Sequence, residues 1–264
     1  MNRIDRLYQR VREEKRISFN AYLCAGYPDI AATCKLIEEF DRLGVDSIEL
    51  GMPFSDPVAD GPALQLAHLR GVESGLTLRG LLGLVGELRG CCEIPICLMS
   101  YYNPLLRYGE ERLVRDAVGA GVDGLIVPDL PPEEAGALIA VARRYDLKTI
   151  FFIAPTTPPE RVSIINHAST GFIYCISVTG VTGARQALPA ELRESLRSLR
   201  TVCDKPLVVG FGVSTVEHIR SLREVCDGAI VGSGIARQLE GAPADLLHRA
   251  RDYVMPLIEA VRCP

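Results

Sequence analysis

The stretch IAATCKLIEEFDRLGVDSIELG, residues 30–51, joins a helical pattern directly to a strand pattern. In residues 30–44 the apolar side chains recur at helical spacing, and the pattern ends at Gly44, a common helix terminator. Residues 45–51 form a short, nearly continuous apolar run, which is typical of a strand buried on both faces of a parallel sheet. A helix followed at once by such a strand is the repeating unit of an α/β fold.

The same unit recurs along the chain. Strand-like apolar runs begin at Ile17, Val45, Ile94, Val122, Leu147, Gly171, Lys205 and Asp227. Helical patterns lie among them at residues 110–121, 131–146, 189–202, 214–225 and 244–261, and an amphipathic segment precedes the first strand. Eight alternations predict a single-domain (β/α)8 TIM barrel over residues 1–264, with an additional N-terminal helix. A doubly wound open sheet is the alternative, but eight repeats within this length favour closure.

Composition excludes several classes of function. The chain has 264 residues, 23% of them charged, with a formal net charge of -4 and no basic block, which argues against nucleic acid as a partner. No apolar run approaches the roughly 20 residues needed to cross a membrane. The nine cysteines are scattered and form no CxxC pair, so we expect reduced thiols in the cytoplasm rather than a disulfide framework.

Glu49 lies near the C-terminal end of the second predicted strand, the end at which barrel enzymes carry out their chemistry. Burial there would raise the pKa of its carboxyl group towards neutrality, which suits general acid/base catalysis. A strand-end salt bridge or a helix cap is the alternative. Asp56 and Asp60 follow in an ordered, non-helical loop, residues 53–62. Each is typical of a turn or an N-cap, but their place directly after Glu49 suggests a paired acid/base site.

Lysines and histidines are missing from the expected catalytic rim. Lys35 belongs to a helix, whereas Lys148 and Lys205 begin strands and therefore lie at the opposite end of the barrel. The histidines fall in helices or connecting loops: His68, His167, His218 and His248. Schiff-base chemistry and a histidine-bound metal are therefore disfavoured. The remaining candidate catalysts are carboxyl groups, tyrosine and a thiol, which favours proton transfer with no metal and no covalent cofactor.

The last two strands both end in glycine-rich turns, at Gly210 and Gly212 and at Gly232 and Gly234, where barrels often bind phosphate. Ser233 could open a helix there and donate a hydroxyl to an anion. Tight turns are the alternative for each glycine pair. After the sixth strand, residues 177–189 are glycine-rich and hydroxyl-rich, which suggests a lid, or else a long surface loop.

Several motifs together resemble the α subunit of tryptophan synthase. They are ELGMPFSDPVADGP (49–62), LMSYYNP (98–104), VPDLPPEE (127–134), YCISVTGVTGAR (174–185), GFGVS (210–214) and GSGIA (232–236). The resemblance covers nearly the whole chain and implies a (β/α)8 lyase. Such an enzyme cleaves indole-3-glycerol phosphate to indole and glyceraldehyde 3-phosphate by a retro-aldol reaction.

The resemblance also implies roles for individual residues. Glu49 would be the general acid/base, Asp60 would hydrogen-bond the indole N–H, and Tyr174 would position Glu49. The substrate would be bound by residues on the strand ends and loops: Tyr22, Leu98, Phe152, Thr182, Gly183, Phe211, Gly212, Ile230, Gly232 and Ser233. Tyr22 stands where the family often has phenylalanine.

A partner follows from the same resemblance. The family works in an α2β2 heterotetramer with a β subunit that carries pyridoxal phosphate, whereas the α chain needs no cofactor. Asp56 and Pro57 would face that β subunit. Three alternatives remain: a stand-alone indole-releasing lyase, a catalytically idle subunit, and a phosphosugar isomerase with Cys24 as base. The isomerase would need an acid after the sixth strand, where this chain has CISVTG.

Overall fold

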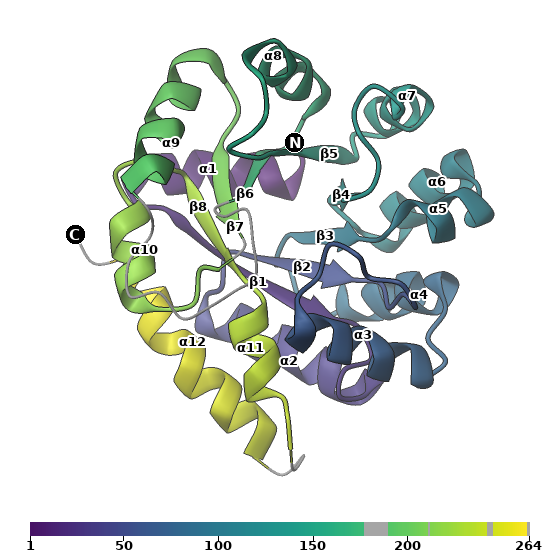
Figure 1. The fold of residues 1–264 in the computed structure, drawn as a ribbon. Coiled ribbons are helices and arrows are strands. Elements are labelled where there is room, and N and C mark those ends of the chain that lie inside the picture. Colours follow the sequence, from purple (N-terminus) through teal and green to yellow (C-terminus); the bar gives the residue numbers. More distant parts are fainter. Residues whose placement is uncertain (177–189, 211, 242–244, 263–264) are drawn as a thin grey trace.

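The computed structural model describes residues 1–176, 190–210, 212–241 and 245–262. Eight parallel strands pair in sequence order and close into a barrel, which the helices surround (Figure 1). The strands are β1 (Ser18–Cys24), β2 (Ser47–Gly51), β3 (Ile96–Met99), β4 (Gly124–Ile126), β5 (Lys148–Ile153), β6 (Ile173–Ile176), β7 (Leu207–Gly210) and β8 (Gly228–Val231). The predicted (β/α)8 barrel is therefore confirmed.

The helices of the described residues cover the outside of the barrel. They are α1 (Arg3–Glu13), α2 (Ile30–Leu43), α3 (Pro62–Glu73), α4 (Leu78–Leu88), α5 (Tyr102–Tyr108), α6 (Glu110–Ala120), α7 (Gly136–Arg144), α8 (Pro159–Ala168), α9 (Ala190–Val202), α10 (Val216–Leu222), α11 (Ser233–Gln238) and α12 (Leu246–Arg262). None of the helices in these ranges is both long and apolar enough to cross a membrane.

The helix that opens the sequence motif begins and ends as the pattern predicts. Asp29 caps α2 by accepting a hydrogen bond from the N–H of Ala32 at 2.7 Å. Gly44 ends the helix with a φ of 80°, a left-handed conformation that glycine adopts without strain. In contrast, α7 begins at Gly136 rather than at residue 131, because the two prolines at 131 and 132 form turns before the helix starts.

Aspartates tie the strands together at the N-terminal end of the barrel. Asp46, Asp123 and Asp227, which precede β2, β4 and β8, accept hydrogen bonds from backbone N–H groups of β1, β3 and β7 at 2.9, 2.9 and 2.8 Å. The buried carboxylate of Asp46 also pairs with Arg16 at 2.7 Å. These contacts fix the register of neighbouring strands, and hence the height of the residues at their other ends.

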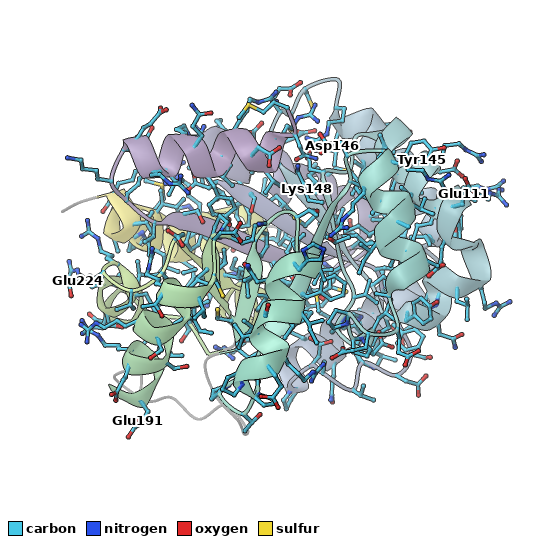
Figure 2. The ribbon with its side chains drawn as sticks, turned by 90° about the horizontal axis from the view of Figure 1, so that it is seen from above. Glu111, Tyr145, Asp146, Lys148, Glu191 and Glu224 are labelled. Carbon is cyan, nitrogen blue, oxygen red and sulfur yellow. The ribbon has the colours of Figure 1, made fainter. Side chains whose placement is uncertain are left out.

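Helix α1 packs against the same N-terminal end. The ring of its Tyr8 lies 5.8 Å from that of Phe172, which directly precedes β6. Lys148, labelled in Figure 2 at the start of β5, pairs with Asp5 of α1 and with Asp146, each at 2.9 Å. The expected position of Lys148, far from the catalytic rim, is thereby confirmed.

Candidate active site

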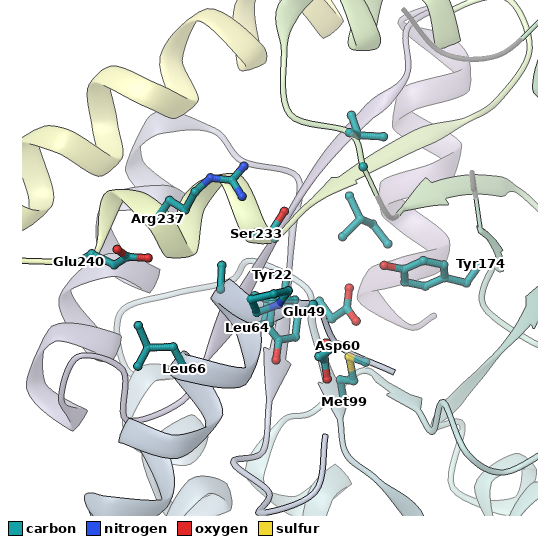
Figure 3. A pocket seen from close by; sticks show the side chains of 17 residues that line it. Tyr22, Glu49, Asp60, Leu64, Leu66, Met99, Tyr174, Ser233, Arg237 and Glu240 are labelled. Atoms are coloured by element: carbon teal, nitrogen blue, oxygen red, sulfur yellow. The ribbon is translucent and has the colours of Figure 1, made fainter. Parts of the chain in front are cut away.

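A cavity of about 480 Å³ opens at the C-terminal ends of the strands (Figure 3). The loop between β2 and α3, the first turns of α3, and the short helix α11 complete its wall. The lining residues are Tyr22, Glu49, Asp60, Gly61, Pro62, Ala63, Leu64, Leu66, Met99, Tyr174, Gly212, Val213, Ile230, Gly232, Ser233, Arg237 and Glu240. It therefore brings together the two predicted acids and several predicted substrate-binding residues.

Glu49 is a buried and unpaired carboxyl group in this cavity. It lies in β2 beside Tyr22 of β1, and only 3% of it is exposed. Neither carboxyl oxygen has a hydrogen-bond partner among the described residues. Burial first, and the nearby charge of Asp60 second, raise the pKa of Glu49 to about 8. The carboxyl group thus holds its proton near neutral pH, and the described residues provide no salt bridge to it.

This raised pKa makes stability depend on pH. The pKa of Glu49 is near 4.5 when unfolded and about 8 when folded, so the native state binds the extra proton between these values. Stability from this group is fully present below the unfolded pKa and is lost as pH rises through the folded one. As pH rises from 5 to 8, we expect the free energy of unfolding of Glu49→Gln, measured in urea, to increase relative to that of wild type. The increase should be up to about 1.4 kcal/mol for each pH unit. A difference that stays constant over this range would contradict the buried, protonated Glu49.

Asp60 lies in the same cavity but accepts a hydrogen bond from a neighbouring side chain. Its Oδ2 accepts a hydrogen bond from the hydroxyl of Tyr101 at 2.7 Å and lies 3.3 Å from Nε2 of His68. Tyr101 also accepts from the N–H of Ala59 at 2.9 Å, so it holds both the loop backbone and the carboxylate. The sequence allowed Asp60 to be a helix N-cap. The N-cap of α3 is instead Gly61, so Asp60 does not have this role.

Tyr174 is held in the wall of the cavity by its neighbours in the barrel. Its ring is buried and packs against the ring of Phe152 at 4.7 Å, across the β5–β6 pair. Phe152 itself does not line the cavity, in contrast to the role inferred from resemblance, and instead supports Tyr174 from the neighbouring strand. A side chain at Gly210 would collide with the Tyr174 ring, so this glycine provides space for the tyrosine.

Leu98 is a predicted substrate-binding residue that lies outside the cavity wall. Leu98 in β3 is 1% exposed and does not line the cavity, whereas the next residue, Met99, does. Successive side chains on a strand point to opposite faces. Met99 therefore points into the cavity, whereas Leu98 points outward to the layer of helices. Ile230, on β8, lies in the cavity wall as expected.

The glycines of the last two strands serve two different purposes. Gly212, with a φ of 87°, and Gly232 line the cavity beside Ser233, the first residue of α11. Gly210 and Gly234 do not line it. A side chain at Gly234 would collide with the hydroxyl of Tyr253 in α12, so this glycine allows α11 to approach α12. Only one member of each pair is therefore placed to approach a ligand.

Some predicted residues lie elsewhere. Thr182, Gly183 and Phe211, together with the predicted lid at residues 177–189, lie outside the described residues. Asp56 is exposed and Pro57 is half-buried, on the outer part of the loop, and neither lines the cavity.

Four residues near the site are not among the predicted site residues, although Tyr101 lies in the motif LMSYYNP. His68 and Tyr101 reach Asp60 from α3 and from the start of α5, and Arg237 and Glu240 line the cavity from α11 and the residues after it. Within the part of the chain that the structure describes, no three His, Cys, Asp or Glu side chains gather as a metal site would require.

Known proteins are similar to this chain in both sequence and fold. The family model "Tryptophan synthase alpha chain" matches residues 8–257. The tryptophan synthase alpha chain of Chloroflexus aggregans is 45% identical over 98% of each chain. Subunit alpha from Legionella pneumophila superposes with a TM-score of 0.91 at 32% identity, covering 99% of this chain and 98% of that one. A chain of the tryptophan synthase complex from Pyrococcus furiosus superposes with a TM-score of 0.85 at 36% identity, covering 92% of this chain and 98% of that one. The chain belongs to the tryptophan synthase alpha chain family.

Proposed function

We propose that this chain cleaves indole-3-glycerol phosphate to indole and glyceraldehyde 3-phosphate, as the lyase component of tryptophan biosynthesis. The observation that carries the proposal is the contrast between two carboxyl groups in one cavity. Glu49 has no hydrogen-bond partner among the described residues and a pKa of about 8, whereas Asp60 accepts a hydrogen bond from Tyr101 and lies 3.3 Å from Nε2 of His68. Paired carboxyl groups in opposite environments divide acid and base roles between them.

The chemistry follows from this division. Protonated Glu49 donates its proton to the third carbon of the indole ring, which leaves a positive charge delocalised onto the ring nitrogen. Asp60 accepts a hydrogen bond from the indole N–H and stabilises that charge. Glu49, now a carboxylate, removes the proton of the side-chain hydroxyl next to the ring. The carbonyl forms, the carbon–carbon bond breaks, and its electron pair returns to the ring as indole leaves.

The rest of the cavity suits the two ends of this substrate. Tyr174, Met99 and Ile230 offer apolar surface to a planar ring. On the side of β7 and β8, the backbone of Gly212 and Gly232 and the hydroxyl of Ser233 offer donors to a phosphate. The reaction needs only proton transfer between these groups, so we propose that the chain uses neither metal nor cofactor.

Arg237 is expected to attract the phosphate. It is the only Lys or Arg among the described lining residues, and in Figure 3 its side chain extends towards Ser233. The ionised acids of the cavity would otherwise repel a dianion. We expect Arg237→Gln to raise KM about fivefold with kcat nearly unchanged, and the effect to shrink as salt is added. Initial rates at two salt concentrations measure this, with exposed Arg79→Gln on α4 as the control for lost charge. An equal rise in KM for both variants would rule out a specific role.

We also propose a partner and a location. The exposed Asp56 and the neighbouring Pro57 would contact a β subunit that carries pyridoxal phosphate, in an α2β2 heterotetramer, and indole would pass to that subunit. The likeness to a chain from a tryptophan synthase complex supports this partner. The free cysteines of the described residues support a cytoplasmic location.

The test is product identification without additives. The purified chain, treated with a metal chelator and given no cofactor, is incubated with indole-3-glycerol phosphate. We expect indole and glyceraldehyde 3-phosphate in equal amounts. A requirement for added metal would contradict the acid/base mechanism, and an isomer of the substrate as product would favour the isomerase.

A further inference from the structure

His68 is a buried imidazole in α3 whose proton can be placed from its contacts. The side chain is 3% exposed, and its Nδ1 accepts a hydrogen bond from the backbone N–H of Phe54 at 3.2 Å. A backbone N–H can only donate, so Nδ1 carries no proton. The ring proton therefore lies on Nε2, and the neutral Nε2–H tautomer is the one that fits.

Two oxygen atoms compete for that single proton. Nε2 of His68 lies 3.3 Å from Oδ2 of Asp60 and 3.2 Å from the hydroxyl of Tyr22. The Tyr22 hydroxyl is turned to this position against Gly51, where any side chain would collide with it. Tyr22 thus presents its ring, and not a free hydroxyl, to the cavity that it lines.

The imidazole also joins the two ends of the loop that carries the proposed partner contacts. One nitrogen accepts a hydrogen bond from the N–H of Phe54, just after β2, and the other lies 3.3 Å from the carboxylate of Asp60, just before α3. Tyr101 binds the same carboxylate oxygen as His68 does, from the start of α5. Asp60 is therefore fixed from two elements, and the position of its carboxylate depends on the tautomer of His68.

We propose that His68 is a positioning residue that orients Asp60 through one Nε2 proton, which it shares with the hydroxyl of Tyr22. The inference rests on the proposed function, since it assigns the support of one of the proposed catalytic groups. Loss of this proton misplaces the charge that stabilises the transition state, while the phosphate side of the cavity is untouched. The expected signature is therefore a loss in kcat and not in KM.

The test compares two substitutions of His68 in the cleavage assay. His68→Leu keeps the volume but has no donor, and we expect kcat to fall about tenfold with KM changed less than about twofold. His68→Gln places an amide N–H near the position of Nε2, and we expect it to recover most of the lost kcat. Wild-type kcat in His68→Leu, or no recovery in His68→Gln, would overturn the proposal. If wild type itself released no indole, the proposed function would fail instead.

The control is a substitution of the other buried histidine, His218, which also lies on a helix outside the barrel. His218 in α10 is 4% exposed, and its Nδ1 accepts a hydrogen bond from the N–H of Ser214 at 3.3 Å. His218→Leu therefore removes a comparable buried imidazole without touching Asp60. We expect its kcat to stay within about twofold of wild type. An equal fall in kcat for both leucine variants would show a general loss of packing and overturn the role of His68.

Two further measurements hold even if His68→Leu does not fold. Nitrogen chemical shifts of the wild-type chain should show His68 as the neutral Nε2–H tautomer at pH 7, and the Nδ1–H form would refute the shared proton. Tyr22→Phe should change kcat more in the wild-type chain than in His68→Gln, because the glutamine amide has two N–H donors and need not share one. Equal effects of Tyr22→Phe in both backgrounds would refute the sharing.

Discussion

Glu49→Gln is expected to lower kcat for indole release about a thousandfold, because the one group that delivers and removes the proton is lost. The substitution keeps the size and the polarity of the side chain. It also removes a buried carboxyl group that has no hydrogen-bond partner in the described part of the chain, so the fold should not suffer. Steady-state kinetics of the purified variant measure the effect.

Binding separates loss of chemistry from loss of the site. We expect Glu49→Gln to bind glycerol 3-phosphate with wild-type affinity by calorimetry, since the proposed phosphate donors lie on β8, α11 and the β7 loop. Glu240→Gln is the matched control, because Glu240 lines the same cavity but is exposed. Its kcat should stay within about twofold of wild type. Near-normal turnover in Glu49→Gln would refute the role given to Glu49.

Asp60→Asn is expected to lower kcat about a hundredfold with little change in KM. The amide cannot carry the negative charge that opposes the positive charge on the ring nitrogen, and one such electrostatic contact contributes on this scale. Tyr101, which donates to the carboxylate, and His68, whose Nε2 lies 3.3 Å from it, would also face a weaker acceptor. Initial-rate kinetics without a β subunit provide the measurement.

The control for Asp60 lies on the same loop. Asp56 is exposed and outside the cavity, so Asp56→Asn should leave cleavage by the isolated chain unchanged. Under the proposed partner role, it should weaken only the stimulation by a β subunit. Equal losses for Asp56→Asn and Asp60→Asn in the isolated chain would mean that the loop, and not the Asp60 charge, is what matters.

Much of the fold could be predicted from the sequence because each strand is a short apolar run between turn residues. Helices α3 and α4 show no clear helical pattern of apolar residues in the sequence, and each has a physical reason for this. On α3, Leu69 and Val72 are exposed, so apolar residues do not mark the buried face. Helix α4 contains three glycines, and glycine disfavours a helix on its own. Both helices are stabilised by packing against the barrel, which cannot be seen in the local sequence.

The candidate site was predictable where position along a strand determines it. Glu49 and Asp60 could be found because one ends a strand and the other closes the loop after it. Which of Leu98 and Met99 faces the cavity could not be predicted, because an apolar run without alternation does not show which side chains point to which face of the strand. His68 and Tyr101 contact Asp60 only in three dimensions, and a histidine within a helix gives no sign of where its ring lies.

The measurement that tests the central claim most directly is the rate of indole release from indole-3-glycerol phosphate by the purified chain, as a tryptophan synthase β subunit is added. We predict slow release by the chain alone and a strong, saturable rise with the partner. High activity that the partner does not change would favour the stand-alone lyase. No indole under either condition would contradict the lyase function itself.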